Sequence, residues 1–116
     1  MGRLGLAAVL VVLAAAVLLA AGCGGSDGEN GASGDDRGKA LFTSEAEPSP
    51  CGSCHVLDDA GTSGAIGPNL DTLQPSAERV ASAMREGPGA MPSFADTLSE
   101  EDIDAVAEYV EAAAGR

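Results

Sequence analysis

The sequence predicts a small all-α domain, for three reasons. Residues 75–86 and 99–114 both place apolar side chains at the i, i+3, i+4 spacing of a helix. No segment alternates polar and apolar residues as a half-buried strand does. Glycine and proline end the helical segments, with Gly87 and Pro88 after the first and Gly115 after the second. We therefore expect helices joined by loops, without a sheet.

Residues 1–22 resemble the signal peptide of a bacterial lipoprotein. Arg3 precedes an uncharged and almost wholly apolar run over residues 4–21. The run ends in LAAGC, which resembles a lipobox and implies cleavage after Gly22 and a lipid on Cys23. Two alternatives stay open: an uncleaved membrane anchor, because the run nearly reaches bilayer length, and cleavage to a free periplasmic protein. Lipid attachment at Cys23 and an uncleaved anchor both place the domain on the outer side of the cytoplasmic membrane, at the cell surface or in the periplasm. In both cases it is anchored through its N-terminus.

Residues 23–36 are predicted to form a flexible linker. After Cys23 the sequence reads GGSDGENGASGDD, in which the largest apolar side chain is that of Ala32. Such a composition cannot bury enough apolar surface to fold, and chains rich in glycine and serine behave as flexible coils. The folded domain is therefore expected over residues 37–116.

The first helix of the domain is expected from about Arg37. The acidic residue before it suits the N-terminus of a helix. Gly38 and Phe42 are four residues apart and share one face of this helix. Pro48 and Pro50 then interrupt the chain.

The motif Cys51-Gly52-Ser53-Cys54-His55 follows. C-x-x-C-H is the attachment signature of c-type haem, in which the two thiols add to the porphyrin vinyl groups and the imidazole of the histidine ligates the iron. The motif therefore predicts one covalent haem c, held by Cys51 and Cys54, with His55 as an iron ligand. The chain has no tryptophan and only 3% aromatic residues, and a buried porphyrin supplies apolar surface that so small a domain lacks.

Two other interpretations of these cysteines are less well supported. A thioredoxin-like dithiol is expected beside a βαβ pattern, and no such pattern is present. A structural zinc site needs four Cys or His ligands. With Cys23 set aside, the chain offers only Cys51, Cys54 and His55.

Two further helices are expected after a glycine-rich loop over residues 59–70. Pro75 suits the first turn of a helix that runs to about Glu86, and its apolar face holds Val80, Ala83 and Met84. The last helix opens at Ser99 in a capping-box-like S-x-x-D pattern. Its predicted buried stripe is Ile103, Val106, Ala107, Val110 and Ala114.

The second iron ligand is expected to be Met91. The chain contains one histidine, so a second histidine within the same molecule is excluded, and methionine is the alternative in cytochromes c. Met84 lies on the apolar face of a predicted helix, where methionine usually packs in the core. Met91 lies in a loop between Pro88 and Pro92 that can hold a thioether in place. Met84, Lys39 and an open coordination position remain as alternatives.

Together these residues resemble a small class I cytochrome c over residues 37–114. The resemblance implies three to five helices wrapped around one haem. It implies that Gly38, Phe42 and Tyr109 form the crossing between the first and last helices. It also implies that the Pro68 carbonyl accepts a hydrogen bond from the imidazole of His55, as an element of the cofactor site. The Met91-Pro92 step matches the family's methionine loop.

The resemblance implies a one-electron carrier and not an enzyme. Its partners would be redox proteins such as a cytochrome bc-type complex and a terminal oxidase or reductase. The formal net charge of −12 argues against nucleic acid as a partner. The negative charge has two interpretations: it attracts a partner with a basic docking surface, or it only keeps the domain soluble.

Two other functions stay open. The chain could be a haem relay subunit of a larger oxidase assembly, which has the same chemistry. It could instead be a sensor or a peroxidase-like enzyme with five-coordinate iron, which requires that Met91 does not bind. The sequence near Met91 contains no second histidine, and its nearest arginine is Arg85.

Overall fold

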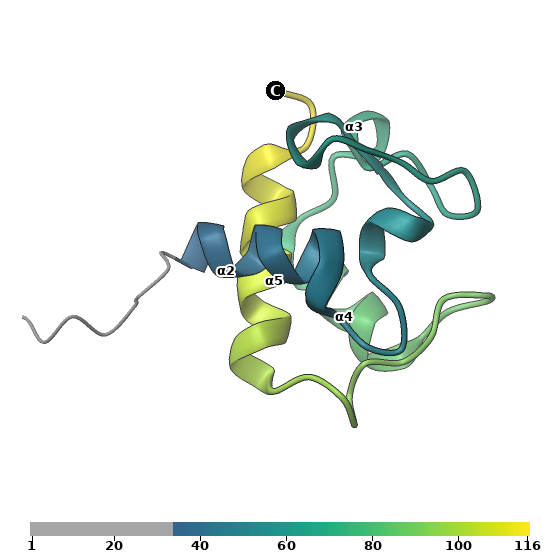
Figure 1. Ribbon diagram of the computed structural model, residues 1–116, viewed down its shortest axis with the longest axis vertical. Coiled ribbons are helices and arrows are strands. Elements are labelled where there is room, and N and C mark those ends of the chain that lie inside the picture. Colours follow the sequence, from purple (N-terminus) through teal and green to yellow (C-terminus); the bar gives the residue numbers. More distant parts are fainter. Residues whose placement is uncertain (1–33) are drawn as a thin grey trace, which may run out of the picture. The chain divides into compact units, whose positions relative to one another are not determined.

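The structure, a computed structural model, describes residues 34–116 (Figure 1). The predicted signal sequence, the lipidation site Cys23 and most of the predicted linker lie outside these residues. Four α-helices are present in the described part: α2 (Gly34–Ala40), α3 (Leu70–Leu73), α4 (Ala77–Glu86) and α5 (Glu100–Ala113). A π-helical turn (Leu41–Glu45) continues α2, and Cys51–Ser53 and Asp58–Ala60 form single 3-10 turns. None of these helices is long and apolar enough to cross a bilayer.

Helix α2 begins three residues earlier than predicted. Gly34, Asp35 and Asp36 were expected to belong to the linker, but they form the first turn of the helix. Two carboxylates in a first turn interact favourably with the partial positive charge of a helix N-terminus. The helix therefore extends into sequence that composition alone assigns to a coil.

Helices α2 and α5 cross in close contact (Figure 1). Gly38 lies at the crossing, where an added Cβ would be 2.3 Å from the carbonyl oxygen of Ala105 and 2.6 Å from Cβ of Tyr109. The rings of Phe42 and Tyr109 meet edge to face next to this point, with centroids 6.1 Å apart. This confirms the crossing expected from Gly38, Phe42 and Tyr109.

Polar side chains reinforce the same crossing. Arg37 donates two hydrogen bonds to the carboxylate of Asp102, of 2.9 and 3.1 Å, and also contacts Glu45. The hydroxyl of Tyr109 donates to Asp59 at 2.8 Å, and Lys39 donates to the same carboxylate at 3.2 Å. These two donors hold the pKa of Asp59 below its ordinary value. Because Tyr109 is buried, the bond to Asp59 satisfies its hydroxyl.

The start of each long helix is fixed by a serine. The Ser99 hydroxyl accepts from the Asp102 backbone N–H at 3.1 Å, as the capping pattern predicts. Ser76 caps α4 in the same way through the Arg79 N–H. Helix α4 therefore begins at Ala77, and the prediction that Pro75 lies in its first turn is wrong. Pro75 precedes the cap.

Two further predictions need correction. A short antiparallel ladder pairs β1 (Val56–Leu57) with β2 (Thr62–Ser63), so the domain is not free of strands. Each strand has two residues, too few for an alternating pattern to show. Helix α5 ends at Ala113, and extended backbone at Ala114 leaves Ala113 as the last fully buried side chain of the stripe.

The apolar core lies where α2, its π-helical turn, α4 and α5 meet. Its largest fully buried side chains come from the π-helical turn, β1, α4 and α5: Leu41, Phe42, Leu57, Met84, Ile103, Val106, Tyr109 and Val110. Asp71 of α3 links the 3-10 turn that begins at Asp58 to the chain just after α5. Its carboxylate accepts from the backbone N–H groups of Asp58 and Gly115, at 2.8 and 3.0 Å.

Candidate functional site

An apolar cavity of about 530 Å³ opens between the C-x-x-C-H segment and the loop that joins α4 to α5. All five residues predicted to bind the cofactor contribute to its wall: Cys51, Cys54, His55, Pro68 and Met91. The rest of the wall is mostly apolar and includes Phe42, Leu70, Val80, Met84, Phe94, Val106 and Val110. A volume of this size lies within the range of small-molecule and cofactor sites. The fold thus brings together residues far apart in the sequence.

The two cysteines are placed by one tight turn. The backbone N–H groups of Cys54 and His55 both donate to the carbonyl oxygen of Cys51, at 3.1 and 3.0 Å. Pro50 has extended backbone and directs the chain into this turn. The two cysteines lie on the same cavity wall and form no disulfide with each other. Burial against the apolar wall raises the pKa of the Cys51 thiol to about 11.

His55 is held by a backbone carbonyl and by a glycine. Its Nδ1 lies 2.8 Å from the carbonyl oxygen of Pro68, and because a carbonyl only accepts, Nδ1 carries the proton. This leaves Nε2 as the ring nitrogen with a lone pair for a metal. Gly67 packs against the ring, where an added Cβ would be 2.4 Å from Cε1.

The loop after the motif folds back on the turn that carries the cysteines. Gly67 N–H donates to the Cys54 carbonyl at 2.8 Å, and the Thr62 hydroxyl donates to the His55 carbonyl at 2.9 Å. Gly64 approaches the backbone of Cys54 so closely that an added Cβ would be 2.6 Å from its carbonyl carbon. These contacts fix the position of the backbone that carries His55.

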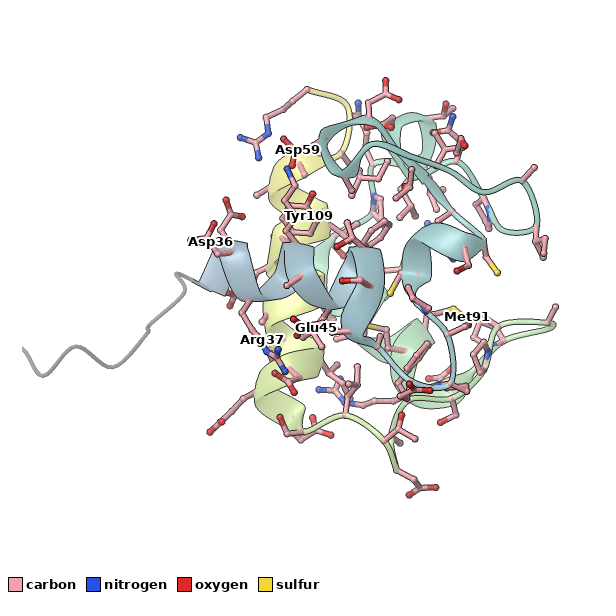
Figure 2. The ribbon with its side chains drawn as sticks, in the orientation of Figure 1. Asp36, Arg37, Glu45, Asp59, Met91 and Tyr109 are labelled. Carbon is pink, nitrogen blue, oxygen red and sulfur yellow. The ribbon has the colours of Figure 1, made fainter. Side chains whose placement is uncertain are left out.

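Met91 lies on the α4–α5 loop (Figure 2). The loop is fastened to the end of α4 by two bonds: Phe94 N–H donates to the Met84 carbonyl at 2.8 Å, and the Ser93 hydroxyl donates to the Arg85 carbonyl at 2.7 Å. Both acceptors are among the last carbonyls of the helix, which have no partner within it. Met91 is thus presented to the cavity by a loop that is fastened to α4 just after Met91.

The alternative ligands lie in different places. Met84 also contributes to the cavity wall, but it is 1% exposed and packs in the core of α4. Lys39 is not part of the wall, and its ammonium group is bonded to Asp59. Arg85, the arginine that the sequence places nearest to Met91, is paired with Glu100 at 2.6 Å and Asp104 at 3.5 Å.

Two residues of the site were missed by sequence reasoning. Gly67 directly precedes Pro68, but nothing in the sequence indicates that it packs on His55. Arg79 is part of the cavity wall. Arg79 is four residues before Ala83 and shares its side of the helix, but nothing in the sequence indicates that this side lines a cavity.

The residues of the cavity fit haem c. The thiols of Cys51 and Cys54 can form its two thioether bonds, and the apolar wall can bury its ring. Imidazole and thioether are the pair of iron ligands found in cytochromes c. Within residues 34–116, no cluster of three or more His, Cys, Asp or Glu side chains could hold a metal ion by itself.

Comparisons with known proteins agree with this fit. The family model described as cytochrome c oxidase, cbb3-type, subunit III matches residues 33–110. Among solved structures, the c-type cytochrome SorU from Sinorhizobium meliloti is 44% identical, covering 72% of this chain and 93% of that chain, with a TM-score of 0.67. No curated protein sequence matches.

These findings confirm the small class I cytochrome c fold and the covalent haem c. They also support electron transfer with redox proteins as partners, because that is the general role of such cytochromes. The chain belongs to the cytochrome c family described as subunit III of cbb3-type cytochrome c oxidase.

Proposed function

We propose that the protein is a one-electron carrier whose haem iron is ligated by His55 and Met91. The observation that carries this proposal is that both side chains line the cavity that holds the two cysteines. Haem c supplies one-electron chemistry when its iron alternates between the ferric and ferrous states. His55 and Met91 would both hold the iron, and a metal held by two protein ligands would leave little room for a substrate to bind to it.

The residues around the two ligands favour fixed coordination. His55 is oriented by the Pro68 carbonyl, and such an outer partner fixes the tautomer and the direction of a ligating imidazole. The Met91 loop is fastened to α4 through Ser93 and Phe94. Fixed ligands change little between oxidation states, which suits a carrier.

We expect the ferric absorption spectrum to distinguish the candidate ligands. The unmodified protein should be low-spin and show the methionine–iron charge-transfer band. Met91→Ala should lose this band, because it removes the only thioether on the anchored loop. Met84→Leu should keep the band, since it preserves the apolar volume of the core.

A high-spin ferric spectrum in the unmodified protein would contradict the carrier and favour the sensor or peroxidase-like function. Loss of the band in Met84→Leu, with the band kept in Met91→Ala, would show that Met84 is the iron ligand. Unfolding of either variant is checked by its circular dichroism.

A relay subunit of an oxidase is the second candidate function. The description of the matching family as subunit III of cbb3-type oxidase favours it, and its haem chemistry is the same. Purification from solubilised membranes separates the two, because a relay subunit purifies with its complex and a free shuttle between a cytochrome bc-type complex and an oxidase or reductase purifies alone.

We further propose that the domain is tethered through a lipid on Cys23, on the outer side of the cytoplasmic membrane. The support is the sequence of residues 1–22, which resembles a lipoprotein signal. Intact-mass measurement of protein made in a host with haem-attachment machinery should give a chain that starts at Cys23 and carries acyl groups and one haem. A mass that begins at Met1 would indicate an uncleaved anchor instead.

A further inference from the structure

Arg79 has an unusual position for a charged residue. It lies near the start of α4 and contributes to the cavity wall beside Val80 and Ala83 of the same helix. Among residues 34–116, it is the only Lys, Arg, Asp or Glu residue of that wall. Arg79 is exposed to solvent. Its guanidinium therefore lies toward the rim of the cavity, while its aliphatic stem can cover apolar surface of the wall.

The side chain of Arg79 has no hydrogen bond or ion pair within residues 34–116, and only its backbone N–H is used, in the Ser76 cap. The sequence has 18 Asp and Glu residues and 6 Lys and Arg residues, so carboxylate partners are plentiful. Arg37 pairs with Asp102 and Arg85 pairs with Glu100. Arg79 thus differs from both of these arginines.

The neighbourhood of Arg79 on the solvent side does contain carboxylates. Glu78 and Glu86 line a shallow groove that Arg79 shares with Ser76 and Ser82. Neither carboxylate is within ion-pair distance of Arg79. The guanidinium is therefore available to an anion at the cavity rim.

Haem c brings two carboxylates into this cavity, on its propionate groups. A carboxylate against an apolar wall is costly unless it is paired and hydrogen-bonded. A guanidinium can pair with a carboxylate through two parallel hydrogen bonds, and it is always charged. The chain has no tryptophan that could donate to a propionate.

We propose that Arg79 binds a haem propionate and thereby sets the reduction potential of the haem. This proposal rests on haem c in the cavity, but it does not depend on which methionine ligates the iron. A positive charge beside the haem stabilises the ferrous form, which carries one positive charge less than the ferric form. Arg79 should therefore raise the potential.

The test is redox titration and resonance Raman spectroscopy of Arg79→Gln, with Arg85→Gln as the matched control. Both variants remove one surface guanidinium of helix α4. In Arg79→Gln we expect the ferric-to-ferrous equilibrium to shift about tenfold toward the ferric form, because one charge at close range is removed. For a one-electron couple this equals about 59 mV. The propionate bending band should shift as well.

Arg85→Gln should leave the propionate band unchanged and shift the equilibrium less than twofold. Equal shifts in the two variants would show a general charge effect and overturn the proposal, as would an unchanged propionate band in Arg79→Gln. Arg79→Lys, which keeps the charge, should retain most of the potential while changing the Raman band. Absence of the methionine–iron band from all of these proteins would contradict the role of Met91. The potentials and propionate bands of the Arg79 and Arg85 variants could still be compared.

Discussion

Gly67→Ala is expected to disturb the iron ligation more than any other single-methyl change in the described chain. The added Cβ would be 2.4 Å from Cε1 and 2.7 Å from Nδ1 of His55, distances that require the ring to move. The ring cannot move without losing its bond to the Pro68 carbonyl. Loss of such an outer partner typically weakens a metal–ligand interaction about 10- to 100-fold.

The measurement for Gly67→Ala combines intact mass with the ferric absorption spectrum. The mass should still show one haem, because Cys51 and Cys54 are unchanged, while the low-spin fraction falls. Gly61→Asn is the control. Gly61 belongs to the same loop, adopts a positive φ that asparagine tolerates and has no neighbour within 4 Å of an added Cβ. A normal spectrum in Gly67→Ala would show that His55 has freedom that the packing does not indicate.

Gly38→Val should produce the largest loss of stability. An added Cβ would be 2.3 Å from a backbone carbonyl oxygen of α5, so a flexible side chain cannot relieve the overlap. Helices α2 and α5 would have to separate, which weakens the Phe42–Tyr109 contact. We expect the free energy of unfolding to fall by about 3 kcal/mol, at the upper end of overpacking costs.

Guanidinium titration of the haem-loaded protein measures this loss as a lower midpoint with an unchanged slope. Gly34→Ala is the matched control, because Gly34 lies in the same helix and an added Cβ meets nothing within 4 Å. It should change the unfolding free energy by no more than about 0.5 kcal/mol, in the stabilising direction. If Gly38→Val and Gly34→Ala had the same midpoint, the close crossing would not contribute to stability.

The parts of the fold that the sequence predicts are those encoded by neighbours along the chain. Ser99 and Asp102 form a local cap, and the structure contains it. Ser76 forms the same cap, but Pro75 is also a common helix starter and obscured it. The ladder of β1 and β2 went unpredicted because its two-residue strands are held by the side chain of Thr62 and the turn at Gly61 and have no periodic pattern of their own.

The candidate site also has some residues that the local sequence indicates and others that only contacts between segments reveal. The motif residues and the methionine loop could be proposed as site residues from the sequence, because residue types and their spacing indicate the chemistry. That they meet at one cavity is a property of the fold. Gly67 and Arg79 could not be identified, since the importance of each depends on a neighbour from another segment: an imidazole for Gly67 and a cavity rim for Arg79.

The direction in which the described chain enters the domain determines how the protein can be joined to other molecules. Gly34 begins α2, and Phe42, at the other end of the same helical segment, lines the cavity. Figure 2 shows Asp36 and Met91 on opposite sides of the domain. A fusion partner joined directly at Gly34 would therefore leave the cavity mouth open to a redox protein in solution. A conductive support attached at the same point would exchange electrons with the haem slowly, because the width of the domain would separate them.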